Sequence, residues 1–112
     1  MKLKVLLSLL LCVVSLPLLA KTENKYNESY SYTRGVEEFS GENYELALSW
    51  FERELSEHPD NGYAYSYIAA MRYNNDEYGA ALSAVDKALK YIPKKDKEWR
   101  SISLDTRSNI HL

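Results

Sequence analysis

The stretch NYELALSWF, residues 43–51, returns in a similar form 34 residues later as EYGAALSAV, residues 77–85. The two stretches carry the same four residue types at matching places, namely Tyr44 and Tyr78, Ala47 and Ala81, Leu48 and Leu82, and Ser49 and Ser83. The same shift places Pro59 on Pro93. Small, aromatic and proline positions that recur in one register indicate a repeated structural unit rather than two unrelated helices.

The apolar residues around each copy follow the period of an α-helix. Leu48, Phe51 and Leu55 recur at spacings of three and four, as do Tyr78, Ala81, Leu82 and Val85 in the second copy. Polar breaks occur at residues 40–43 and 74–76, and a proline follows each repeat. No run alternates with a period of two, so strands are not expected. The sequence therefore predicts an all-α chain with helix hairpins at residues 28–59 and 62–93.

The residue types at the repeated positions suit closely packed antiparallel helices. Small side chains let two helix backbones approach, and large rings fill the space beside them. The positions that we expect to be structural are Gly35, Tyr44, Ala47, Phe51, Pro59, Ala69, Tyr78, Ala81, Ala88, Pro93 and Trp99.

A helix–turn–helix unit of 34 residues with this pattern resembles the tetratricopeptide repeat family. The resemblance implies a right-handed α-solenoid of two repeats. It places Trp99 near the start of a third unit, so that residues 96–110 would form a capping helix over the second repeat. The first unit departs from the family pattern, because Ser31, Arg34 and Glu54 stand where the family prefers Trp, Leu and Ala.

The first twenty residues, MKLKVLLSLLLCVVSLPLLA, differ from the rest of the chain. Two lysines, an apolar run and a final small residue are typical of a secretory signal peptide, which we expect to be cleaved after Ala20. The alternative is an uncleaved membrane anchor, although residues 5–20 are shorter than the roughly 20 residues that span a bilayer. The prediction is an exported protein, periplasmic or secreted, with a flexible linker at residues 21–27 and a domain at residues 28–112.

Composition narrows the chemistry that the chain can perform. The 112 residues include 14 Lys and Arg and 16 Asp and Glu; without Lys2 and Lys4 of the signal the net charge moves from −2 to −4. An acidic chain is not expected to bind nucleic acid non-specifically. Cys12 lies in the signal, so the mature domain has no thiol. His58 and His111 belong to no metal or catalytic motif, and we predict neither a cofactor nor an enzyme.

The ten tyrosines are the unusual feature of the composition. In the tetratricopeptide family the first helix of each unit lines an inner groove, and tyrosine offers a large contact area with a polar tip. The candidate groove residues are Tyr32, Val36, Phe39, Tyr63, Ser66, Tyr67, Ala70, Asn74, Lys97 and Arg100. The two cations favour an acidic segment or a chain terminus as the bound peptide. Alternatively, Tyr63 and Tyr67 pack against the next helix or face water.

The predicted function is a non-catalytic module of the cell envelope or secreted space that binds a peptide or protein segment. Two alternatives remain open at this stage. A chain with fewer than about three repeats can self-associate through its open end, which would make it a structural or scaffold protein. An inhibitor or accessory subunit of an envelope enzyme is the other alternative.

Overall fold

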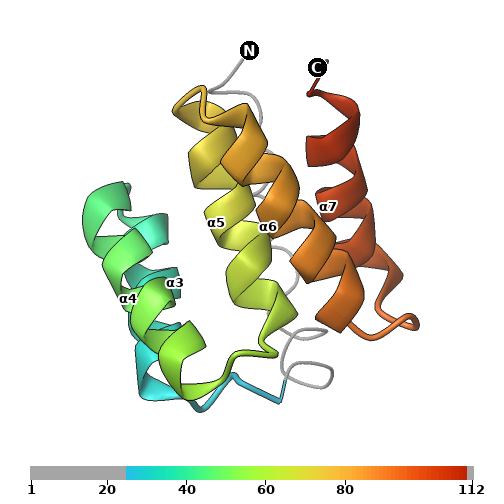
Figure 1. Cartoon of the computed structure of the whole chain (residues 1–112). Helices are drawn as coiled ribbons and strands as arrows, with labels where there is room; N and C mark the ends of the chain where they lie inside the picture. The colour runs from blue at the N-terminus through green and yellow to red at the C-terminus, as the bar shows by residue number, and fades with distance from the viewer. Residues whose placement is uncertain (1–24, 111–112) are drawn as a thin grey trace.

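The computed structural model describes residues 25–110, and all of their regular secondary structure is helical (Figure 1). The helices are α3 (Tyr30–Ser40), α4 (Tyr44–Glu57), α5 (Gly62–Asn74), α6 (Tyr78–Tyr91) and α7 (Lys97–Ser108). The prediction of an all-α chain is confirmed for these residues. None of the five described helices is both long and apolar enough to cross a bilayer. The predicted signal peptide, residues 1–20, lies outside the described part of the chain.

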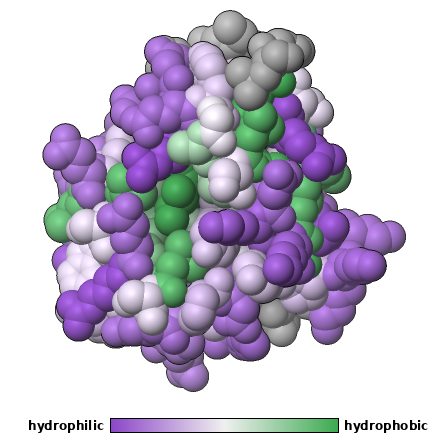
Figure 2. Space-filling model, viewed as in Figure 1, coloured by the Kyte–Doolittle hydropathy of each residue, from purple (hydrophilic) through white to green (hydrophobic). Residues whose placement is uncertain are grey.

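The helices pack in the order in which they occur in the chain. Helices α3 and α4 form one hairpin and α5 and α6 form the next, while α5 also contacts α4 and α7. Helix α7 lies against the second hairpin and contacts both α5 and α6 (Figure 1). Apolar surface gathers in a strip between the two hairpins, bordered by hydrophilic side chains (Figure 2). The helix breaks at residues 41–43 and 75–77 overlap the predicted breaks at residues 40–43 and 74–76.

The 34-residue period extends to the backbone of the turns within the two hairpins. The amide of Asn43 donates to the carbonyl of Glu38 at 2.8 Å, and the amide of Glu77 donates to the carbonyl of Arg72 at 2.9 Å. The residue before each donor, Glu42 or Asp76, has a positive φ of 64°. The two turns are therefore built from the same hydrogen bonds at equivalent positions.

Side-chain packing follows the same period. An ideal Cβ on Gly35 would lie 2.6 Å from Phe51 Cε1, so only glycine fits where α3 crosses α4. The equivalent positions of the second hairpin hold Ala69 and Val85, which is smaller than Phe51, and both are buried. The rings of Phe39 and Tyr44 are 5.4 Å apart, and those of their counterparts, Tyr73 and Tyr78, are 5.5 Å apart. The residue pairs differ in size, but each hairpin closes in the same way.

The predicted linker is corrected at its C-terminal end. Residues 25–28 form a turn, and Tyr26 is buried rather than free in solvent. Its ring lies 5.4 Å from that of His58, and its hydroxyl donates to Asp60 Oδ1 at 2.5 Å. The low content of aliphatic residues suggested a flexible segment, but a single tyrosine is enough to attach this part of the chain to the end of the first hairpin.

Candidate functional site

The structure brings the predicted groove tyrosines together in a row of aromatic rings. The centroids of Tyr32 and Tyr67 are 6.2 Å apart, those of Tyr67 and Trp99 are 5.5 Å apart, and those of Tyr63 and Trp99 are 5.4 Å apart. Helices α3, α5 and α7, which are the first helices of the three predicted units, each contribute to the row. Tilted and edge-to-face contacts at these distances are favourable.

Most of the predicted groove residues are buried. Tyr63 and Tyr67 expose only 2% and 1% of their surface. The other buried members are Tyr32, Phe39, Ser66 and Ala70. Val36, Asn74 and Arg100 are half-buried, and Lys97 is exposed. Of the alternatives for Tyr63 and Tyr67, the structure shows packing against the next helix, and it corrects the expectation that their rings line an accessible surface.

Polar contacts within this row attach α7 to α5. The hydroxyl of Tyr63 donates to Asp96 Oδ2 at 2.7 Å, and Asp96 also accepts from the backbone amide of Trp99 at the start of α7. The hydroxyls of Ser66 and Ser103 are 2.9 Å apart and buried. Because buried polar groups need partners, these pairs fix the position of the last helix. Sequence reasoning missed Asp96 and Ser103, whose partners Tyr63 and Ser66 lie more than 30 positions away.

Arg100 has a structural role that the sequence did not predict. Its Nη1 donates to the carbonyl of Leu89 at 2.7 Å and to that of Ile92 at 3.0 Å. These carbonyls lie at the C-terminal end of α6, where a cation is favoured by the helix dipole. The prediction that Arg100 presents its charge in the groove is therefore corrected, and Lys97 is left as the exposed cation of the predicted set.

Glu54 forms a buried hydrogen-bonded cluster at the end of α4. Its side chain is fully buried and accepts from Ser29 Oγ at 2.5 Å and from Asn61 Nδ2 at 2.8 Å. Its Oε2 also lies 3.1 Å from His58 Nδ1. Asn61 in turn accepts from the amides of Tyr63 and Ala64 and so caps α5. A buried carboxylate is tolerated when it is bonded in this way.

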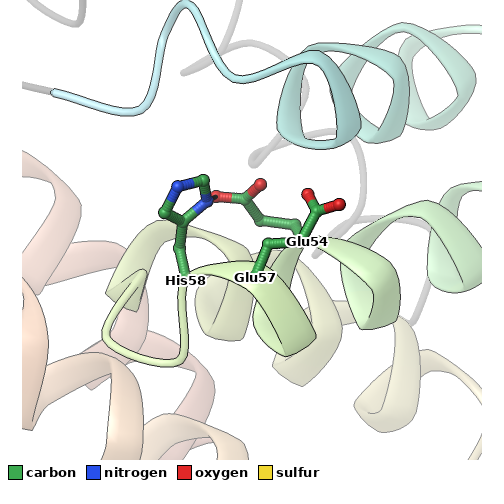
Figure 3. A group of neighbouring side chains, drawn as sticks. All are labelled: Glu54, Glu57 and His58. Atoms are coloured by element: carbon green, nitrogen blue, oxygen red, sulfur yellow. Dashed lines mark hydrogen bonds and ion pairs between the residues drawn. The ribbon is translucent and has the colours of Figure 1, made fainter.

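The end of α4 is also where the described residues could hold a metal ion. One ligand atom each from Glu54, Glu57 and His58 can be chosen so that all lie within 4.8 Å of one another (Figure 3). Carboxylate and imidazole are suitable ligands for zinc. However, Ser29, Asn61 and His58 already use the oxygens of Glu54. We therefore interpret the cluster as a junction between elements.

Burial and hydrogen bonding shift the pKa of two groups beside this cluster. Burial, followed by the hydrogen bond to Asp60, raises the pKa of Tyr26 well above its usual value. The same hydrogen bond lowers the pKa of Asp60, although partial burial opposes the change and Lys25, 3.8 Å away, assists it. In the first hairpin, burial and the charge of Glu42 raise the pKa of Tyr44.

Two surface clusters of rings and cations were not predicted. On the first hairpin the ring of Trp50 lies 5.5 Å from that of Tyr30 and within 5.6 Å of two guanidinium groups, those of Arg34 and Arg53. On the second hairpin the stacked rings of Tyr65 and Tyr91 are 6.2 Å apart. Lys87 lies over Tyr65, and Lys90 lies over Tyr91. Among these four contacts, a local sequence signal was available only for Trp50, because Arg53 follows it three positions later on the same helix.

Comparison with known proteins gives no relative from which a role could be transferred. No family model, curated protein or solved structure matches the chain. Its function has to be inferred from the residues and contacts described above.

Proposed function

We propose that this chain is a non-catalytic protein-interaction module of the cell envelope or secreted space, built from two tetratricopeptide-like hairpins and a capping helix. The period of 34 residues supports this architecture, because it recurs in the sequence, in the two turns and in the paired rings of the hairpins. Repeats of helix hairpins create extended surfaces suited to binding other chains. The step from this fold to protein binding is an analogy.

The observation that carries the proposal is the alignment of α3, α5 and α7, whose buried rings form a row from Tyr32 through Tyr67 to Trp99. In the proposed arrangement a peptide lies along these helices. Among the predicted groove residues, Val36 and Asn74 are half-buried and Lys97 is exposed, and we call these three accessible residues the groove edge. Because the tyrosines behind this edge are buried, a partner reaches their rings only when neighbouring side chains move. Because Arg100 caps α6, any preference of this site for acidic peptides depends on Lys97.

Site-directed photo-cross-linking in the native compartment tests the proposal. A photoreactive residue at position 74 or 97 should capture the same partner protein, and purified partner should then compete with that capture. Position 83 is the matched control, because Ser83 is exposed on α6, the second helix of its hairpin. Capture that is equal at all three positions, or absent at positions 74 and 97, would argue against a groove on the first helices.

A second measurement separates binding from packing. Tyr63→Phe keeps the ring but removes the hydroxyl that donates to Asp96, and Lys97→Ala removes an exposed charge. We expect Tyr63→Phe to lower stability by about 1 kcal/mol, as for a typical buried hydrogen bond. Lys97→Ala should leave stability unchanged and weaken partner capture. If Lys97→Ala captured the partner as well as the wild type does, the charge of Lys97 would have no part in binding.

A further inference from the structure

Two segments of the chain carry opposite charge. Residues 25–60, which include the first hairpin, contain nine carboxylates and three cationic side chains, so their formal charge is −6. Residues 87–100, at the end of α6 and the start of α7, contain six cations and two carboxylates, so their formal charge is +4. The chain as a whole has a charge of only −2. The net charge of the chain is therefore small although positive and negative side chains are concentrated in different segments.

The basic end presents lysines that are available for an external partner. Lys87, Lys90 and Lys94 are exposed, and none of them takes part in an ion pair within the described chain. The stacked rings of Tyr65 and Tyr91 lie beneath two of these lysines. Tyr91 is 37% exposed and adds apolar contact area. We call this surface the lysine–tyrosine patch.

At the acidic end, the cations are already neutralised. Arg34 pairs with Glu37 and Glu38, and Arg53 pairs with Glu57. In contrast, Glu28, Glu42 and Glu45 are exposed and form no ion pair within residues 25–110. Two large apolar side chains are exposed on the same hairpin, Tyr30 at 68% and Leu46 at 47%. The first hairpin thus offers negative charge together with apolar contact area.

The α3–α4 turn, residues 41–43, lies far from the α6–α7 loop, whereas Asp60 is close to that loop because the adjacent Gly62 packs against Ile92. In Figure 1 the turn between α3 and α4 is at the upper left, and the α6–α7 loop is at the lower right. Hydrophilic side chains cover the lower right of the same view in Figure 2. The carboxylates of the α3–α4 turn therefore cannot meet the basic end of the same chain without unpacking of the helices between them. Complementary surfaces on distant parts of one molecule fit a head-to-tail contact between copies.

We propose that this protein self-associates head to tail, with the lysine–tyrosine patch of one copy docked on the acidic first hairpin of the next. This contact uses neither the row of rings nor the groove edge at Asn74, so it is independent of the proposed peptide binding. A heterologous contact of this kind continues beyond a dimer unless the assembly closes into a ring. The contact is governed by charge and is therefore sensitive to salt.

Analytical ultracentrifugation of purified protein tests this proposal. In about 20 mM salt the average mass should rise with concentration beyond that of a dimer, and in about 0.5 M salt the association constant should fall at least about tenfold, since the Debye length shortens several-fold. A wild-type protein that stays monomeric in low salt would overturn the proposal. A mass that stops at a dimer would overturn the head-to-tail arrangement.

Charge reversal at each end provides the decisive comparison. The triple variant Lys87→Glu, Lys90→Glu and Lys94→Glu should be monomeric, as should the double variant Glu42→Lys and Glu45→Lys. Mixing the two variants should restore association, because each end again meets an opposite charge. Arg107→Glu, at an exposed position near the other end of α7, is the control and should associate like wild type. Circular dichroism verifies folding, and a mixture that remains monomeric would contradict the proposed pairing.

Discussion

The side-chain amide of Asn61 donates a hydrogen bond of 2.8 Å to the buried carboxylate of Glu54, and this contact joins the end of one helix hairpin to the start of the next. Asn61 caps α5 with its side-chain oxygen and donates to Glu54 with its side-chain nitrogen. Glu54 also accepts from Ser29, immediately before α3. One carboxylate thus fixes the relative positions of three helix ends.

Replacement of Glu54 should therefore destabilise the protein strongly. Glu54→Ala leaves Asn61, Ser29 and His58 without their shared acceptor, and we expect a loss of about 3 kcal/mol in the free energy of unfolding. Backbone strain is not expected to contribute, since Ala88 occupies the equivalent position of the second hairpin. Urea denaturation followed by circular dichroism measures the loss. Glu57→Ala, on the exposed side of the same turn, is the control and should cost less than about 1 kcal/mol; equal losses would contradict the role assigned to Glu54.

The contact between Gly35 and Phe51 predicts a coupled pair of substitutions. Gly35→Ala introduces a methyl group 2.6 Å from the ring of Phe51 and should cost about 2 kcal/mol. Phe51→Val removes buried ring volume and should cost a similar amount, about 2 kcal/mol. The double variant reproduces the pair found at Ala69 and Val85 in the second hairpin, so its loss should be smaller than the sum. A double-mutant cycle of unfolding free energies checks this, and strict additivity would show that the two sites are independent.

The positive φ angles predict a stabilising substitution in the first turn. Glu42 has a φ of 64°, a conformation that costs a non-glycine residue about 1–2 kcal/mol. Glu42→Gly relieves this strain at some cost in chain entropy and should raise stability by about 1 kcal/mol. Glu45→Gly, inside α4, should instead lower stability by about 1 kcal/mol. Thermal unfolding of both variants and the wild type measures these changes in stability. A Glu42→Gly variant less stable than the wild type would contradict the strain argument.

The pair formed by Tyr26 and Asp60 predicts an acid-sensitive contribution to stability. The pKa of Asp60 is lower in the folded protein than its usual 3.8, so the folded state binds this proton more weakly than the unfolded state does. The contribution is present above the usual pKa and is lost as the pH falls through the folded value. Tyr26→Phe removes the hydrogen bond and should raise the pKa of Asp60 toward its usual value. Carboxyl chemical shifts in an NMR titration measure that change, and an unchanged pKa would contradict the assigned cause.

In alkali, the stability that Tyr26 contributes falls as the pH rises, whereas the contribution of Asp60 falls as the pH decreases. The pKa of Tyr26 is raised above its usual 10.0, so the folded state retains the phenolic proton after the unfolded chain has lost it. The stability from Tyr26 is present below about pH 10 and is lost as the pH rises toward the folded value. Above about pH 10, the free energy of unfolding should therefore fall more steeply with pH in the wild type than in Tyr26→Phe. Parallel slopes would indicate that Tyr26 titrates normally.

The sequence alone determined the helices, their breaks and the close contacts within each hairpin. A helix hairpin joins residues that are near in the chain, so the spacing of Gly35, Phe51 and the prolines already carries that information. The equivalent turns at Glu42 and Asp76 follow from the same period. Local preferences and a repeated pattern act together here, and no distant contact is needed to decide between helix and strand.

Tertiary structure decided which side chains meet when hairpins and the last helix come together. Tyr63 reaches Asp96 across 33 residues, and Arg100 caps α6 from the following helix. A sequence position shows that a tyrosine or an arginine lies on one face of a helix, but its partner depends on the angle and depth at which the next helix packs. The same dependence hides the cluster around Glu54, because a carboxylate on a helix looks solvated until Ser29 and Asn61 close over it.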